Sequence, residues 1–424
     1  MDMKIVDEAV EQIAQVLPER QIDLVRLKAL APIERPATVT VIGKYNHGKS
    51  RLLNELIGHD IFSVADRRET IALSEHTHQS EHLQQPVSWL DAPGLDADVI
   101  GEDDRLAQEA LWCKSDIRLF VHSVKEGELD SAEHPLLQRL DQDTQRTQRQ
   151  TLLVLTQVDQ VADPAVLSQV INTIEQQVPQ LTTFPVSATR HRQGLEGGKQ
   201  LLLQRSGLTE LRAALDAALG NVPQARKHEK ALLFTEINEE LLQRHDRLQQ
   251  QLQDLRQTQH SQRQAFDDGL DGVLKKVCED LQPTLDMIDH DDALVPDSFD
   301  NMFKMTAGKQ ERARLQVAYS LACIEINSHL VRHGVVSLPA QQRSNVRSLD
   351  TVMIAVLGVS VKSRKDLRKI FGEQTGRDKL RHGFAHYFEL SNDRVALAQQ
   401  LVMLEADLLQ ADQARTALHR LGAA

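Results

Sequence analysis

The sequence predicts an α/β domain with a mostly parallel sheet, preceded by one helix and followed by an all-α helical bundle or stalk. Two changes of pattern along the chain support this prediction. Between about residue 37 and residue 220, short β-rich runs alternate with helical stretches. From about residue 224 onward strand signals vanish, and apolar residues fall at helical spacing.

The elements follow in order along the chain. Residues 1 to about 30 are predicted to form one amphipathic helix. Strands that alternate with helices favour a parallel sheet covered on both faces. We therefore expect an N-terminal helix over 1–32, an α/β domain over 33–222 and a helical domain over 223–424. The predicted strands lie at 38–42, 87–90, 117–124, 151–158 and 183–188.

The helical region contains a long predicted helix over 226–282. Apolar residues recur every seventh position from Phe234 to Leu255, which is typical of a coiled coil. Pro283 and Pro296 indicate a break after it. We expect the first helix of the chain to pack with the last one. Further helices are predicted at 311–331, 349–371 and 394–421.

Composition limits the class of protein. The 424 residues carry a formal net charge of -12, which argues against a nucleic-acid partner. Three cysteines without paired spacing favour a reducing compartment. No apolar run approaches the roughly 20 residues that span a bilayer. We expect a cytoplasmic protein, with peripheral attachment to the inner membrane left open.

The segment GKYNHGKS, residues 43–50, fits the pattern G-x-x-x-x-G-K-[ST]. Gly43 and Gly48 allow the backbone to curl so that N–H groups point at phosphate oxygens. Lys49 is expected to reach the β- and γ-phosphates, and the Ser50 hydroxyl to bind Mg²⁺. A helix begins at this point, and its positive end adds attraction for an anion. The pattern predicts a nucleotide site.

Three later motifs stand at the ends of predicted strands. WLDAPG supplies Asp91 for Mg²⁺ and the Gly94 N–H for the γ-phosphate. LTQVD supplies Asp159, which can accept from guanine N1–H and the 2-amino group together. VSA, residues 186–188, offers a backbone N–H to guanine O6. Because ligands of such sheets bind at the carboxyl ends of strands, the set predicts a guanine-nucleotide site.

These motifs resemble those of the translation-factor-related GTPases, in the Era-like and bacterial dynamin-like branch. The resemblance covers about residues 37 to 220 and implies GTP or GDP with Mg²⁺ as ligands. It implies catalytic roles for Asn46, Lys49 and Thr70, with Thr77 as the alternative to Thr70. The metal ligands would be Ser50, Thr70 and Asp91. The implied nucleotide contacts are Gly43, Asn46, His47, Gly48, Lys49, Ser50, Arg51, Asp91, Gly94, Thr156, Gln157, Asp159, Ser187 and Ala188.

The sequence departs from the family pattern at two positions. Gln157 replaces the usual lysine, which alters the stem that stacks on guanine. Leu95 follows DAPG, where a glutamine would orient water. We expect slow hydrolysis until a partner or G-domain dimer activates it. Asn46 is a candidate K⁺ ligand in that closed site, or it bonds only within its own loop. His47 is interpreted as a tolerated surface residue.

Three functions stay open. The first is a dynamin-like GTPase that couples GTP hydrolysis to motion of a helical stalk, through G-domain dimers. The second is a regulatory switch that binds a ribosome or protein complex. The third is a helical scaffold in which nucleotide only stabilises the fold.

Two segments of the helical region have more than one interpretation. Residues 352–372 are either a membrane tip or a buried helix, and 377–389 combine basic and aromatic residues that suit RNA.

Overall fold

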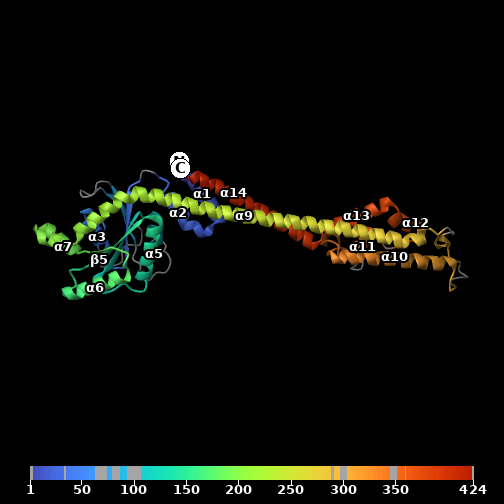
Figure 1. Cartoon of the computed structure of the whole chain (residues 1–424), viewed down its shortest axis with the longest axis horizontal. Coiled ribbons are helices and arrows are strands. Elements are labelled where there is room, and N and C mark those ends of the chain that lie inside the picture. The colour runs from blue at the N-terminus through green and yellow to red at the C-terminus, as the bar shows by residue number, and fades with distance from the viewer. Residues whose placement is uncertain are drawn as a thin grey trace. The chain divides into compact units, whose positions relative to one another are not determined.

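The computed structural model describes residues 3–32, 35–62, 74–78, 86–92, 107–287, 291–296, 303–343, 351–358 and 360–422. The chain divides into two compact units (Figure 1). Unit 1 comprises Met1–Arg244 with Gln410–Ala424, and unit 2 comprises His245–Leu409. The domain boundaries at 32 and 222 stay predictions.

Within the described residues, unit 1 holds one six-stranded sheet in the order β2-β3-β1-β4-β5-β6. The pairs β3-β1, β1-β4, β4-β5 and β5-β6 are parallel, and β2 pairs antiparallel with β3. The predicted mostly parallel sheet is therefore confirmed. The strands are β1 Ala37–Gly43, β2 Ser74–His78, β3 Val87–Asp91, β4 Ile117–Ser123, β5 Gln150–Thr156 and β6 Thr183–Pro185.

The edge strand β2 is absent from the sequence prediction. Its sequence, SEHTH, has no alternation of apolar and polar residues, and Glu75 to Thr77 are exposed. Backbone pairing with β3, from Ser74 opposite Asp91 to His78 opposite Val87, forms this strand. A strand without a buried face carries no period-two signal.

Side chains of successive strand residues are buried in two apolar cores, one on each face of the sheet. On β4, Leu119 and Val121 join the core under α3 and the first part of α9, whereas Phe120 joins the core under α5 and α6. This alternation is expected of a sheet covered on both faces. The helical elements of this part are α3 Lys49–Ile57, η2 Glu109–Lys114, η3 Val124–Glu126, α5 Glu133–Thr147, α6 Pro164–Gln177, α7 Ala188–Gly197 and α8 Gln200–Gln204.

The N-terminal segment is two helices rather than the one predicted. α1 spans Met3–Val16, the short η1 spans Pro18–Arg20, and α2 spans Gln21–Ala29. Pro18 interrupts the helix because its nitrogen donates no hydrogen bond. Both helices bury apolar residues against α9 and against the end of α14, for example Ile13 beside the cluster that holds Ile237 and Leu418.

The long helix α9 runs from Leu208 to Leu285, a length of 78 residues. It therefore begins well before the predicted start at 226, and it passes through Pro223. Leu219 and Val222 before that proline are buried in the sheet core, and this burial outweighs the local cost of the proline. The helix ends two residues after Pro283.

Unit 2 packs helices around one apolar core. The predicted single helix over 349–371 is wrong, since α11 ends at Leu357 and a second helical segment begins at Arg364. Val352, Leu367 and Phe371 are buried in the core, so the structure favours the buried reading of 352–372. Leu380, Phe384 and Phe388 are also core residues, which leaves no exposed aromatic set for RNA there. The elements are η4 Asp292–Leu294, α10 Ala307–Arg332, η6 Ala340–Gln342, α11 Val352–Leu357, α12 Arg364–Leu367, η8 Arg368–Gly372, α13 Gln374–Glu389 and α14 Asn392–Gly422.

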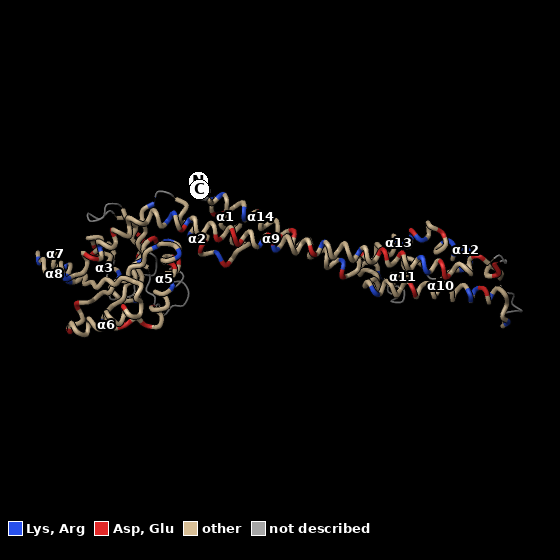
Figure 2. The backbone as a smooth tube through the Cα atoms, viewed as in Figure 1, with Lys and Arg blue, Asp and Glu red and all other residues tan. Residues whose placement is uncertain are grey.

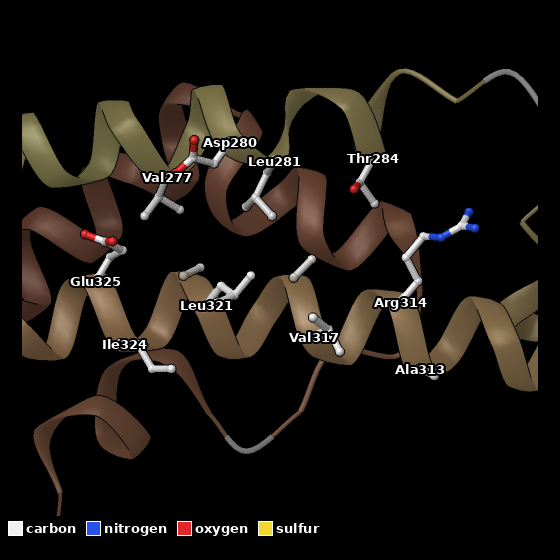
Figure 3. Close-up of a pocket in the computed structure, with 12 residues that line it drawn as sticks. Val277, Asp280, Leu281, Thr284, Ala313, Arg314, Val317, Leu321, Ile324 and Glu325 are labelled. Atoms are coloured by element: carbon white, nitrogen blue, oxygen red, sulfur yellow. The ribbon is translucent and has the colours of Figure 1, made fainter.

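Among the described residues of unit 2, apolar side chains are exposed in a groove and around the start of α10. Between α9 and α10 lies a groove of about 580 Å³, lined by Val277 and Leu281 from α9 and by Val317 and Leu321 from α10 (Figure 3). Around the start of α10, Phe303 is 96% exposed. Figure 2 shows acidic and basic residues interspersed along α9 and α10. Among the described residues, no helix combines the length and apolarity needed to cross a bilayer.

Candidate nucleotide-binding site

The phosphate loop connects the end of β1 to the start of α3. Steric constraints require glycine at two of its positions. Gly43 has φ 151°, and a Cβ at this position would lie 2.1 Å from the Val121 carbonyl oxygen. Gly48 has φ 83° and is the N-cap of α3. Residues with a side chain rarely adopt such angles, so glycine is required for this loop path.

Lys49 and Ser50 lie at the first turn of α3. The Lys49 ammonium donates to the carbonyl oxygens of Gly43 at 3.0 Å and Lys44 at 2.8 Å. The Ser50 hydroxyl donates to Asp91 Oδ2 at 2.9 Å. Asp91 ends β3, which neighbours β1, so the sheet brings together two residues 41 positions apart.

The Ser50–Asp91 pair fits a divalent cation. Asp91 is 3% exposed, and among the described residues its Oδ1 has no hydrogen-bond partner. Burial raises the pKa of Asp91, although the hydrogen bond from Ser50 and the charge of Lys49 act in the opposite direction. A hydroxyl oxygen next to an unsatisfied carboxylate oxygen matches the oxygen preference of Mg²⁺.

The motif after β5 holds the phosphate loop in place. Gln157, at φ 61°, donates from Nε2 to the Asn46 carbonyl at 2.7 Å and accepts from the Ser123 hydroxyl at 2.8 Å. The Thr156 hydroxyl donates to the His47 carbonyl at 2.5 Å. Sequence reasoning treated Gln157 only as an altered stacking stem, and it missed this clamp between two loops.

The residues predicted to read the base lie together. The Ser187 hydroxyl donates to Asp159 Oδ1 at 2.6 Å and also caps α7 by accepting from the Arg190 N–H. The Ser187 N–H is already used by the Ser206 carbonyl at 2.8 Å. The expected backbone donor to the base is therefore Ala188, the first residue of α7.

Other predicted residues lie apart or outside the described ranges. Thr70, Gly94 and Leu95 lie outside the described residues. Thr77 is exposed in β2, opposite Ser88, which is three residues along β3 from Asp91. Three residues along a strand correspond to roughly 10 Å, so this register places Thr77 about that far from the level of Asp91. Such a separation disfavours Thr77 as the switch threonine.

Two predicted residues of the loop and of α3 face solvent. Asn46 is exposed at φ 60°, and Arg51 is exposed in the first turn of α3. The K⁺ role of Asn46 and the nucleotide contact of Arg51 stay predictions.

The interpretation of His47 as a surface residue is wrong. Its side chain is 3% exposed and lies against β4 and the start of α5. His47 Nδ1 lies 3.3 Å from the Val121 carbonyl, and its ring meets the His122 ring edge-on at 5.3 Å. The partners lie more than 70 residues away along the chain, so the loop sequence alone gives no sign of this burial.

Comparison with known proteins agrees with this geometry. Residues 38–157 match the family described as 50S ribosome-binding GTPase. Over 160 residues the chain is 29% identical to the GTPase Era of Bordetella petrii, covering 38% of this chain and 52% of Era. The chain thus contains a P-loop G domain related to that of Era. It belongs to the same family as an uncharacterized protein of Acinetobacter baylyi, with 54% identity over 95% of this chain and 94% of that protein.

Two solved structures are also similar. Era of Aquifex aeolicus bound to GDP and AlF4- covers 40% of this chain and 56% of Era, with 24% identity and a TM-score of 0.31. A bacterial dynamin from an oligomerised pair covers 97% of this chain and 76% of its own, with 14% identity and a TM-score of 0.37.

Proposed function

We propose that the protein binds GTP with Mg²⁺ and hydrolyses it to GDP and phosphate. The observation that carries this proposal is the Ser50–Asp91 pair beside the phosphate loop, where Asp91 Oδ1 has no hydrogen-bond partner within the described ranges. Ser50 would hold the cation directly, and Asp91 would hold it through water. Bound Mg²⁺ would neutralise charge on the β- and γ-phosphates. Lys49 would turn from the loop carbonyls to the phosphates.

Specificity for guanine rests on Asp159. Its carboxylate is fixed by the Ser187 hydroxyl and can accept from two donors of guanine, which adenine does not offer as a pair. A base that leaves such acceptors unpaired is rejected strongly. Hydrolysis is slow for the isolated chain because leucine at position 95 cannot orient water. Asn46 recruits K⁺ when two G domains pair, and this charge stabilises the transition state.

A base-swap experiment tests the site. In Asp159→Asn the side chain loses one acceptor and gains a donor, so GTP binding falls more than about tenfold and xanthosine triphosphate binding rises. Asp163→Asn is the matched control, because Asp163 is an exposed helix cap and asparagine caps equally well. Calorimetric titration measures both. Equal affinity of Asp159→Asn and wild type for GTP would exclude Asp159 from the site.

Turnover tests the catalytic part. Phosphate release is compared in K⁺ and Na⁺ buffers for wild type and Asn46→Ala at high protein concentration. We expect K⁺ to accelerate wild type only. Equal rates in both salts would contradict the role of Asn46, and no release under any condition would contradict hydrolysis itself.

The helical unit is proposed to act on an anionic membrane surface. The contact is the tip, which we define as residues 291–296 and 303–306. Its apolar side chains are strongly exposed: Leu294 is 65% exposed, Phe303 96% and Met305 72%. Arg312 donates to the Ala293 carbonyl, and Lys309 to the Lys304 carbonyl, so cationic residues lie at the same place. Exposed apolar residues beside cations suit an anionic bilayer interface.

Sedimentation separates this role from a regulatory one. With a non-hydrolysable GTP analogue, wild type should pellet with vesicles containing phosphatidylglycerol, and Phe303→Ser combined with Met305→Ser should reduce binding about tenfold. Val402→Ser is the control, since Val402 is 66% exposed on α14 away from the tip. Pelleting with ribosomes but not with vesicles would favour the regulatory switch and overturn the membrane role.

A further inference from the structure

Three metal-ligating side chains converge beneath the phosphate loop. His47 comes from the loop itself, His122 from β4, and Glu133 is the first residue of α5. All three are buried, with exposures of 3%, 1% and 1%. One ligand atom of each lies within 4.8 Å of the other two. Nothing in the binding of nucleotide described above uses the His122 or Glu133 side chains.

The atoms that would bind a metal lie close to one another. Glu133 Oε1 lies 3.1 Å from His122 Nδ1 and 3.7 Å from His47 Nδ1. The other nitrogen of His122, Nε2, donates to the Gly127 carbonyl at 3.0 Å. Histidines that bind metals usually donate their second N–H to a carbonyl or carboxylate in this way, which fixes the ring orientation. His122 is therefore already oriented as a metal ligand.

The spacing matches a small tetrahedral ion. Zn²⁺ at about 2.0–2.1 Å from each ligand places neighbouring ligand atoms about 3.3 Å apart. The two distances to Glu133 bracket that value. The ligand atoms of the remaining pair, His47 and His122, lie within 4.8 Å of each other, so a bound ion would draw the two rings closer. Two nitrogens and one carboxylate oxygen are a zinc ligand set, whereas Mg²⁺ prefers oxygen alone.

We propose that His47, His122 and Glu133 form a binding site for Zn²⁺, distinct from the Ser50–Asp91 site. On binding, His122 Nδ1 gives up its proton to solvent while its Nε2–H continues to donate to Gly127. The His47 Nδ1 proton, which the Val121 carbonyl accepts in the metal-free site, moves to solvent or to Nε2 of the same ring. Because the His47 carbonyl accepts from Thr156, the ion would tie the phosphate loop to β4, α5 and the base-reading motif.

Metal binding by the full chain tests this directly, without reference to GTP turnover. Protein stripped with a chelator is titrated with Zn²⁺ in excess Mg²⁺ and GDP, in competition with a chromophoric chelator. We expect one tight Zn²⁺ per chain. Co²⁺ should give tetrahedral visible bands without thiolate charge transfer, since the three cysteines are free and outside the cluster.

Variants identify the ligands. His122→Asn and Glu133→Gln should each weaken Zn²⁺ binding by more than about tenfold. His260→Asn, an exposed histidine on α9, and Asp91→Asn should bind Zn²⁺ as wild type does. Zn²⁺ should raise the melting temperature of wild type, His260→Asn and Asp91→Asn but not of the two ligand variants, which is informative even where a ligand variant is less stable.

Two outcomes would overturn the site. One is the absence of stoichiometric Zn²⁺ binding by wild type, which would make the cluster a buried hydrogen-bonded network only. The other is unchanged Zn²⁺ affinity in both ligand variants. Neither outcome affects the proposed binding of GTP, which the base-swap experiment tests separately.

Discussion

At the scale of single residues, Gln157 illustrates a role that depends on two loops. Its side chain joins the Asn46 carbonyl in the phosphate loop to the Ser123 hydroxyl at the end of β4. The sequence shows that a glutamine replaces the family's lysine. It does not show that the amide N–H of Gln157 has an acceptor and that its carbonyl oxygen has a donor.

We predict that Gln157→Ala binds GDP about tenfold more weakly, corresponding to roughly 1.4 kcal/mol, because two partly exposed hydrogen bonds that order the loop are lost. Gln160→Ala, an exposed glutamine three residues on, should bind as wild type. Titration with fluorescent GDP measures both. Equal weakening in the two variants would contradict the clamp.

At the scale of elements, α2, α9 and the sheet are joined by buried charges. Arg26 on α2 is 2% exposed and pairs with Glu229 on α9 and with Asp116 just before β4. Asp116 also accepts from Arg226 and from the Thr38 N–H. No local pattern in the sequence marks these residues, because each partner comes from a different element.

Arg26→Ala should destabilise unit 1 by about 3–5 kcal/mol, since it removes one counter-charge and its hydrogen bonds from two buried carboxylates, Glu229 and Asp116. Lys28→Ala, on the same helix, breaks only an exposed pair with Asp7 and should cost less than about 1 kcal/mol. Urea unfolding followed by tryptophan fluorescence compares them, because both tryptophans, Trp89 and Trp112, belong to unit 1. Similar losses in both variants would argue against the buried network.

The same network predicts acid sensitivity. Burial raises the pKa of Asp116, but the hydrogen bond from Arg226 and the charges of Arg26 and Arg35 outweigh it, so the pKa lies below its ordinary value. A depressed pKa stabilises the fold above the unfolded value of about 3.9, and this contribution is lost as the pH falls below about 4. Melting temperatures across this range should fall less steeply for Asp116→Asn than for wild type. Parallel curves would contradict the prediction.

At the scale of the whole molecule, the two ends of the chain meet within unit 1. Ile13 on α1, Ile237 on α9 and Leu418 on α14 belong to one apolar cluster. The amphipathic pattern of the terminal segments predicts that each buries a face. The structure adds that α9 is the element they share, and it replaces one N-terminal helix by two.

Leu418→Ala should lower the stability of unit 1 by about 2–5 kcal/mol, because it leaves a cavity in this cluster. Leu409→Ala on the same helix removes a side chain that is 59% exposed and should change stability by less than about 0.5 kcal/mol. Thermal unfolding measures both, and proteolysis should release α1 faster only in Leu418→Ala. Equal effects would show that the cluster does not hold the ends.

The sequence by itself determined the local chemistry of this protein. Neighbouring residues are enough to predict the order of most strands and helices, the phosphate loop and the motif expected to read guanine, because dihedral preferences and periodic burial are local properties. Tertiary structure alone decided the edge strand β2, the passage of α9 through Pro223, and the meeting of His47 with His122 and Glu133. Each of these depends on contacts between residues far apart in the chain, where pairing or burial outweighs local preference.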